Sequence, residues 1–487
     1  MKLDWKMELY WRLPIIAQER ALSLFARRLD RLYYGGTFES ECRQIRDTHW
    51  PSQDAIEAWQ MGRLRTLLPR ATASVPHYRS ALRGLDVGRL RSIADLRELP
   101  LLDRQAVRRR EREFLDEGLD PRRLFKDKTS GTTGTSVTVY WPIGPLRRLQ
   151  ATLEVRVRNA AGVSRLLPRA MLGGRPIVPG DTRKAPFWRY NRFWKQLYLS
   201  SYHVSRESAP SYVTAIRGSG VEWITGYGSA IAALAESAMA AGVDPIRMKC
   251  VVVSGDTLQP GMRKSIEGFF RCRCFDSYGQ VEGFSMAMEC EEGRLHLVPE
   301  VGIVEIVRED GSPCSAGEVG EMVATGLLND GMPFIRYRTG DFAAYAVDQN
   351  CRCGSNHPVI EALEGRVDDY LVTADGRRIG RLSTAVKRSP SIHSAQIVQD
   401  RPGSGYLLIR PGEGYRSEDA LPVVDDIIER IGAFDLDVLE VEEIPKMPTG
   451  KTRLVVRLYD RPELASLYRD VLARSGRRGR TPELRIS

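Results

Sequence analysis

A loop of small and hydroxylated residues is the first stretch of the 487-residue sequence that could do chemistry. Residues 129–136 read TSGTTGTS, which combines two glycines with six hydroxyl side chains. Glycine lets backbone N–H groups line a concave anion site, and the hydroxyls add donors that can rotate toward it. The loop therefore predicts phosphate binding. A Ser/Thr/Gly surface turn is the alternative for such a run taken alone.

The residues after this loop exclude one kind of phosphate site. Residues 137–141 (VTVYW) are β-branched and aromatic, which predicts a strand or a hairpin. A kinase-type loop would instead continue into a helix after Gly-Lys-Ser/Thr. The later sequence Gly450-Lys451-Thr452 also lacks that motif, because Pro445 stands where its first glycine is needed.

Two further polar stretches follow predicted strands, residues 250–256 (CVVVSGD) and 275–283 (FDSYGQVEG). A third polar stretch, residues 335–341 (IRYRTGD), comes after the strand predicted at residues 320–326. In open α/β sheets, ligands bind beyond the carboxyl ends of the strands. We therefore expect these stretches and the hydroxyl loop to converge on one cleft.

The elements that must position these residues predict an α/β protein with more than one domain. A chain of 487 residues exceeds one typical core. Residues 1–85 show helical periodicity and form a helical N-terminal arm of the large domain, and residues 86–365 alternate β-branched runs with helical patterns. The composition changes near residues 364–370, so residues 366–487, which end in a basic tail, are expected to form a small C-terminal domain.

Composition narrows the class of protein but does not choose a partner. The formal charge of +10 would suit nucleic acid, an anionic membrane surface or a polyanionic small molecule. No aromatic residues interleave the arginine runs, so nucleic acid is disfavoured. No apolar run reaches the length of a membrane span, and the N-terminus lacks a secretory signal pattern, so we expect a cytoplasmic location. The eight cysteines then predict no disulfide framework.

Five motifs in order resemble the AMP-forming adenylating enzymes, a superfamily that contains acyl-CoA synthetases, luciferases and peptide-synthetase adenylation domains. The resemblance covers about residues 75–460, and its motifs are residues 129–134 (TSGTTG), 278–282 (YGQVE), 337–341 (YRTGD), 365–369 (GRVDD) and 448–451 (PTGK). A finer match is to the phenylacetate-CoA ligase-like branch, including its capsular polysaccharide biosynthesis members. It rests on residues 60–78, 254–256, 289–290, 295–296 and 351–354.

The resemblance implies a fold and a reaction. The fold would be a large N-terminal adenylation domain of layered sheets and helices with a small, mobile α+β C-terminal domain. The reaction would join a carboxylate to ATP, giving acyl-AMP and pyrophosphate, and then pass the acyl group to CoA. Because both reactants are anions, the enzyme must neutralise charge and align the two groups.

The resemblance also assigns roles to residues. Lys451, Glu282 and Arg366 would be catalytic, Glu282 as a Mg²⁺ ligand and Arg366 as a phosphate partner, while Asp368 would be the hinge of the C-terminal lid. Asp341 would accept the ribose hydroxyls. The remaining ATP- and AMP-binding residues would be Ser130, Gly131, Thr132, Thr133, Gly134, Thr135, Gly255, Asp256, Tyr278 and Gly279. Taken one by one, Asp341 could be a turn residue and Glu282 a solvated acid.

The phosphate loop departs from the pattern of many family members. Their loops continue Thr-Gly-x-Pro-Lys, whereas Gly134 here is followed by Thr135, Ser136 and Val137. The phenylacetate-CoA ligase branch commonly lacks that lysine as well, so we expect activity to be kept.

A second group of residues suits a metal. Three thiols and an imidazole, those of Cys290, Cys351, Cys353 and His296, match the donors of a tetrahedral structural Zn²⁺ site, and similar residues occur in zinc-bearing relatives of the branch. The alternative is a set of buried thiols with a satisfied histidine, because Cys-x-Cys is tighter than the usual zinc spacing. Cys272, Cys274 and His357 are the alternative ligands.

The expected function is thus a magnesium- and ATP-dependent ligase for a small carboxylic acid, aryl or otherwise hydrophobic, with CoA as acceptor. Alternatives left open are another acceptor, as in an amide ligase, nucleotidyl transfer alone, or a nucleic-acid-binding scaffold with an inactive adenylation fold. The acid pocket is expected around residues 173–176, 202–203 and 226–228, with His203 more readily a packing residue. A homodimer is one open alternative for the oligomeric state.

Overall fold

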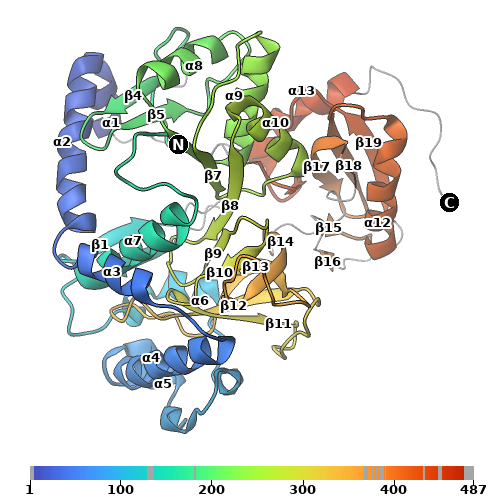
Figure 1. Ribbon diagram of the computed structural model, residues 1–487. Helices are drawn as coiled ribbons and strands as arrows, with labels where there is room; N and C mark the ends of the chain where they lie inside the picture. The colour runs from blue at the N-terminus through green and yellow to red at the C-terminus, as the bar shows by residue number, and fades with distance from the viewer. Residues whose placement is uncertain are drawn as a thin grey trace.

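The computed structural model describes residues 5–128, 137–179, 182–366, 371–374, 378–379, 382, 389, 391–431, 434–447 and 452–475. A twelve-stranded sheet runs through the larger part of the molecule, and a four-stranded sheet lies at one side of it (Figure 1). Among the described residues, no helix combines the length and the apolar character needed to cross a membrane.

The chain begins with helices. They are α1 (Trp5–Arg12), α2 (Ile15–Tyr34), α3 (Phe38–Asp47), α4 (Gln53–Ser74) and α5 (Pro76–Ala81). The Ser52 hydroxyl accepts the backbone N–H of Ala55 at 3.2 Å and caps the start of α4. Helix α4 ends at Ser74 because Val75 precedes a proline, and Pro76 then suits the first position of α5.

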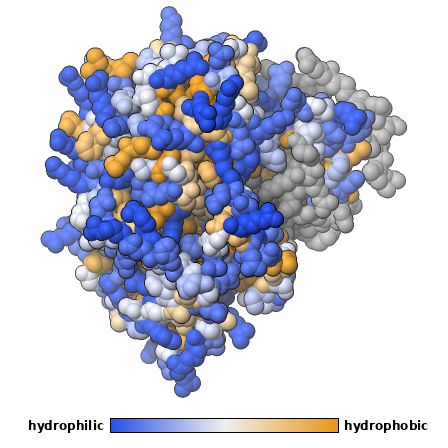
Figure 2. All heavy atoms as spheres, in the orientation of Figure 1, coloured by the Kyte–Doolittle hydropathy of each residue, from blue (hydrophilic) through white to orange (hydrophobic). Residues whose placement is uncertain are grey.

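Helix α2 lies along an outer edge of the molecule, on the side opposite the C-terminal strands (Figure 1). Its acidic residues face the protein. Glu19 Oε1 accepts the backbone N–H of Tyr190 at 2.9 Å, and Asp30 Oδ1 accepts the indole N–H of Trp194 at 2.9 Å. Hydrophilic and hydrophobic residues are interspersed over this edge in Figure 2. The outer face of α2 is therefore separate from the contacts that hold the helix in place.

The large sheet has a parallel half and an antiparallel half. Strands β3, β5, β6, β7 and β8 are parallel, β4 is an antiparallel edge, and β9 to β14 pair antiparallel. Their order is β11-β12-β13-β14-β10-β9-β8-β7-β6-β3-β5-β4. The bounds are β3 (Arg169–Gly173), β4 (Trp188–Asn191), β5 (Gln196–Ser200), β6 (Trp223–Gly226), β7 (Cys250–Ser254), β8 (Arg273–Gly279), β9 (Met286–Glu289), β10 (Leu295–Leu297), β11 (Gly302–Val307), β12 (Gly320–Gly326), β13 (Tyr337–Tyr345) and β14 (Val359–Arg366).

Helices cover the sheet and supply its core. The parallel half packs against α8 (Ala209–Gly218), α9 (Gly228–Ala240) and α10 (Pro260–Phe270), and the small side chains of α9 let α10 approach it closely. A second core joins α4 to the hairpin strands β1 (Phe125–Lys128) and β2 (Thr138–Trp141), α6 (Arg104–Arg109), α7 (Ile143–Thr152) and the π-helical Leu153–Asn159. Short 3₁₀ helices span Val87–Arg89, Ile93–Glu98, Glu111–Phe114, Ser417–Ala420 and Pro462–Leu464. The predicted α/β class is confirmed.

The C-terminal part has its own sheet and apolar core. The sheet order is β19-β18-β17-β20, with an antiparallel pair, β17 and β18, between two parallel neighbours. Helix α12 packs Val423 and Ile427 against Ile397 and Ile409 of this sheet. The elements are β15 (Leu371–Val372), β16 (Arg378–Ile379), β17 (Ile392–Arg401), β18 (Ser404–Pro411), α12 (Leu421–Ile431), β19 (Asp435–Glu440), β20 (Val455–Arg457) and α13 (Ala465–Ser475).

Helices α9 and α10 carry the contacts between the two sheets. Glu236 Oε1 lies 2.8 Å from His393 Nε2, and the other oxygen of Glu236 pairs with Arg410. The Gln259 side chain pairs with the backbone of Ala395 through both of its polar atoms. These partners are mostly buried, so the position of the C-terminal sheet depends on few, well-defined groups.

Gly261 in α10 allows the contact between α10 and the C-terminal sheet to be tested. A Cβ on Gly261 would lie 2.4 Å from the Cα of His393, whereas a Cβ on Gly268 of the same helix would meet nothing within 4 Å. We expect Gly261→Ala to loosen the contact, since overpacking costs about 1–3 kcal/mol, and to speed tryptic release of the C-terminal part about fivefold or more. Gly268→Ala is the matched control and should slightly raise the melting temperature. Equal proteolysis of the two variants would contradict the prediction.

Candidate functional site

Three polar side chains meet where the parallel half of the sheet ends. Tyr278 lies at the end of β8, and its hydroxyl donates to Asp341 Oδ2 of β13 at 2.7 Å. The Gln280 amide donates to the same Oδ2 at 2.7 Å and to the Tyr278 oxygen at 2.6 Å. The structure thus brings together the predicted Tyr278 and Asp341. It also places Gln280 in the cluster, a residue inside the YGQVE motif for which no role was predicted.

Glu282 and Tyr337 lie close to this cluster. The Glu282 side chain is buried, with 7 % of the residue exposed. Burial raises the pKa of the Tyr337 phenol, and the negative charges of Glu282 and Asp341 raise it further, against the opposing effect of Arg104. The Tyr337 hydroxyl has no hydrogen-bond partner within the part of the chain that the structure describes. A buried carboxylate and a buried hydroxyl thus lie close to Asp341.

The carboxylate of Glu282 is a suitable ligand for a hard cation. Mg²⁺ takes oxygen ligands and usually keeps several waters, so one or two protein carboxylates are enough to hold it with a phosphate group. Glu282 supplies such an oxygen, and the nearby Asp341 adds negative charge.

Asp256 holds a neighbouring loop. Its carboxylate accepts the backbone N–H of Gly228 at 2.8 Å, that of Ser229 at 3.1 Å, and the Ser229 hydroxyl at 2.5 Å. These groups begin α9, so the carboxylate satisfies helix N-terminal donors. Gly255 has a φ of +86°, which favours glycine at the turn after β7. The segment predicted for the adenine pocket is thereby fixed to the start of α9.

The segments predicted for the acid pocket meet at the ends of β3, β5 and β6. The Tyr202 hydroxyl donates to the Gly174 carbonyl at 2.8 Å. The His203 ring stacks on Phe187 at 5.1 Å and has Nδ1 2.8 Å from the Ser200 hydroxyl, which is a packing environment.

Gly226 lies where β6 and β3 approach each other closely in this region. Its φ is +146°, and a Cβ there would lie 1.8 Å from the Leu172 carbonyl oxygen. Only glycine therefore fits between β6 and β3 at this point.

Several predicted site residues cannot be placed. Ser130, Gly131, Thr132, Thr133, Gly134, Thr135, Asp368 and Lys451 lie outside the described residues. Arg366 is described only as backbone, where it pairs with Asp341 in the ladder between β13 and β14. Gly279 ends β8 beside Tyr278.

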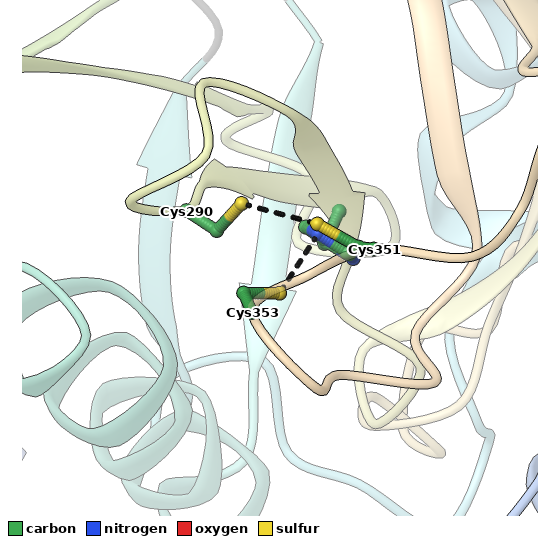
Figure 3. A group of neighbouring side chains, drawn as sticks. Cys290, Cys351 and Cys353 are labelled. Carbon is green, nitrogen blue, oxygen red and sulfur yellow. Dashed lines mark hydrogen bonds between the residues drawn. The ribbon is translucent and has the colours of Figure 1, made fainter.

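The second predicted group of residues forms one compact cluster. The ligand atoms of Cys290, His296, Cys351 and Cys353 all lie within 4.8 Å of one another, and the labelled thiols converge in Figure 3. Cys290 Sγ is 3.7 Å from Cys351 Sγ, and Cys353 Sγ is 3.5 Å from His296 Nε2. Ligands of tetrahedral zinc at about 2.3 Å would be roughly 3.8 Å apart.

The surroundings of the cluster favour metal binding. Burial lowers the pKa of His296, which keeps the imidazole neutral, and its Nδ1 lies 3.1 Å from the His357 carbonyl oxygen. An outer partner of this kind orients a metal-binding histidine. Burial acts to raise the pKa of Cys351, but hydrogen bonds from the backbone of Cys353 and from neighbouring thiols lower it overall. The alternative ligands Cys272 and Cys274 are not in the cluster.

Comparisons with known proteins agree with this architecture. The family model of the CapK C-terminal domain matches residues 371–458. CapK of Staphylococcus aureus is 24% identical over 458 residues, which cover 92% of this chain and 98% of CapK. Phenylacetate-coenzyme A ligase of Thermus thermophilus is 26% identical over 343 residues, 66% of this chain and 72% of that protein.

A solved structure has the same fold. It is 2-hydroxyisobutyryl-CoA ligase in the postadenylation state, which matches with a TM-score of 0.61 and 19% identity over 86% of this chain and 92% of that one. The resemblance predicted from the five motifs is therefore confirmed. By sequence and by fold, the chain is an AMP-forming, carboxylate–CoA ligase-like enzyme related to CapK and to the phenylacetate-CoA ligases.

Proposed function

We propose that the protein activates a small carboxylic acid, aryl or otherwise hydrophobic, with ATP and transfers the acyl group to CoA. In the first half-reaction a carboxylate oxygen attacks the α-phosphorus and pyrophosphate leaves. In the second, the CoA thiolate attacks the acyl carbon and AMP leaves. The observation that carries the proposal is the joint hydrogen bonding of Tyr278, Gln280 and Asp341 beside the buried Glu282.

The cluster is suited to holding a nucleoside. The ribose hydroxyls would donate to the Asp341 carboxylate, which Tyr278 and Gln280 already orient through its Oδ2. The Tyr278 ring would offer a stacking face to adenine. Asp256 would act indirectly, because it positions the Gly228 and Ser229 backbone at the edge of the same region.

Charge neutralisation would come from groups around the phosphates. A magnesium ion held by Glu282 would offset the negative charge of ATP when bound. Residues 130–135 would surround the β- and γ-phosphates, Arg366 would pair with phosphate, and Lys451 would contact the bridging oxygen as charge moves between the two anions. Asp368 would be the hinge that lets the C-terminal part change position between half-reactions.

We also propose that the cluster of Cys290, His296, Cys351 and Cys353 holds a structural zinc ion. With four protein ligands the ion would be closed to substrate. It would join the β9–β10 turn to the loop before β14. Strand β10 pairs directly with β9 and with β14.

Lys451 gives the first test. Replacing Lys451 by Ala should lower carboxylate-dependent ATP–pyrophosphate exchange by about 10²–10³-fold, because one preorganised transition-state partner is lost. The control is Lys446→Ala in the same segment, whose ammonium lies 3.5 Å from Glu443. Exchange that persists unchanged in Lys451→Ala would contradict the role.

A panel of carboxylic acids, with mass spectrometry of products with and without CoA, identifies acid and acceptor.

Tyr278 gives the second test. Tyr278→Phe removes the hydrogen bond to the charged Asp341, which is worth about 1.5–3 kcal/mol, so the KM for ATP should rise about tenfold or more with a smaller change in kcat. Tyr345→Phe is the matched control. Tyr345 ends β13, the strand that also carries Asp341, and its hydroxyl donates to the Val304 carbonyl at 2.6 Å, outside the cluster of Tyr278, Gln280 and Asp341. An unchanged KM for ATP in Tyr278→Phe would count against nucleotide binding there.

The metal proposal is tested by elemental analysis. The purified protein should contain about one zinc per chain by plasma mass spectrometry. Cys351→Ser should lose the metal and lower the melting temperature, while Cys314→Ser, which changes a cysteine outside the cluster, should keep it. Full zinc content in Cys351→Ser, or none in the unaltered protein, would refute the site.

A further inference from the structure

The outer face of α2 joins basic and apolar side chains. Residues one or two turns apart, at helical spacing, point away from the protein, namely Ile16, Arg20, Leu24, Arg27, Arg28 and Arg31. Ile16 and Leu24 are 67% and 68% exposed, values that mark them among the most exposed large apolar residues of the described chain. We call these six residues the α2 stripe.

Among the described residues, no acidic side chain pairs with the arginines of the α2 stripe. The two acids of α2, Glu19 and Asp30, face the protein and accept hydrogen bonds from residues of the β4 strand and the turn after it. None of the four arginines of the stripe has an ion-pair partner among the residues that the structure describes. The stripe therefore presents uncompensated positive charge.

Neighbouring residues extend this surface. Phe25 is 58% exposed at the border of the stripe. The turn after β4 carries exposed Arg192, Phe193 and Lys195, and it is held to α2 because the Arg192 backbone N–H donates to the Ser23 hydroxyl at 3.1 Å. In α1, Leu9 is 56% exposed as well. Hydrophilic and hydrophobic residues thus lie side by side along this edge (Figure 2).

We propose that the α2 stripe, with Phe25 and the turn after β4, binds the surface of an anionic lipid membrane. Arginines would contact the lipid phosphates while Ile16, Leu24 and the phenylalanines enter the boundary between headgroups and acyl chains. The stripe runs from Ile16 to Arg31 of the 20-residue α2 and is therefore about 23 Å long. Few apolar residues would enter the lipid, so binding is shallow, reversible and weakened by salt.

Other occupants fit the stripe less well. In a twofold dimer built on this face, the four arginines of one copy would meet those of the other and repel them. Single-stranded nucleic acid is bound by a succession of aromatic side chains that stack on bases, whereas this surface has Phe25 and Phe193 only at its border and aliphatic residues along the stripe. The stripe also lies opposite the C-terminal strands (Figure 1), so a membrane there would leave the contacts of Glu236 and Gln259 untouched.

The test uses the full-length protein and vesicles made of phosphatidylcholine alone or with 30% phosphatidylglycerol. In flotation assays the protein should bind the anionic vesicles, release them in high salt, and bind neutral vesicles weakly. Arg27→Glu/Arg28→Glu should reduce partitioning at least about tenfold. Arg108→Glu/Arg109→Glu, an adjacent exposed pair on α6 with the same change in charge, is the matched control and should bind nearly as the unaltered protein does.

Leu24→Ser/Phe25→Ser tests the apolar part and should weaken binding severalfold without changing net charge, with circular dichroism melts to verify folding. The proposal is overturned if the unaltered protein ignores anionic vesicles or if both arginine pairs matter equally. It is also overturned if the Arg27/Arg28 change abolishes dimerisation in sedimentation equilibrium, or binding of a single-stranded oligonucleotide, while vesicle binding is kept.

Discussion

One oxygen, Asp341 Oδ2, accepts hydrogen bonds from both Tyr278 and Gln280. These two bonds connect the two halves of the large sheet at the site. Tyr278 comes from β8, where the parallel half ends, and Asp341 comes from the antiparallel half. Because several strands separate β8 from β13 in the sheet, the sheet must curve for these side chains to touch. A carboxylate buried in this way needs its donors, so the hydrogen bonds also limit how far the two halves can shift.

The sequence predicted those parts of the site that depend on backbone chemistry and on ligand types. The glycines and polar residues after buried strands indicated where β7 and β8 end, whereas residues 337–341 form the start of β13. The donor types of Cys290, His296, Cys351 and Cys353 indicated a cluster that the fold brings together across 61 residues. Both signals are local, because strand ends and metal ligands require particular residue types.

Contacts that any polar residue could have made were not predictable. The sequence does not reveal that Asp256 would bind the first residues of α9, or that Gln280 would share an acceptor with Tyr278. Likewise, the pairing of Glu236 with His393 depends on how the C-terminal sheet packs on α9, which periodicity does not specify. The outward direction of the α2 arginines follows only once the partners of Glu19 and Asp30 are known.

The closeness of Gly226 to the Leu172 carbonyl limits which changes are possible in the region expected to form the acid pocket. With 1.8 Å between that oxygen and any added Cβ, every non-glycine residue at this position would force two neighbouring strands apart. Randomising residue 226 would thus yield misfolded chains rather than new selectivity. Engineering must instead vary side chains that project from the strand ends, such as Tyr202 and Tyr227, which can change the volume and polarity of the region while the backbone between them stays as it is.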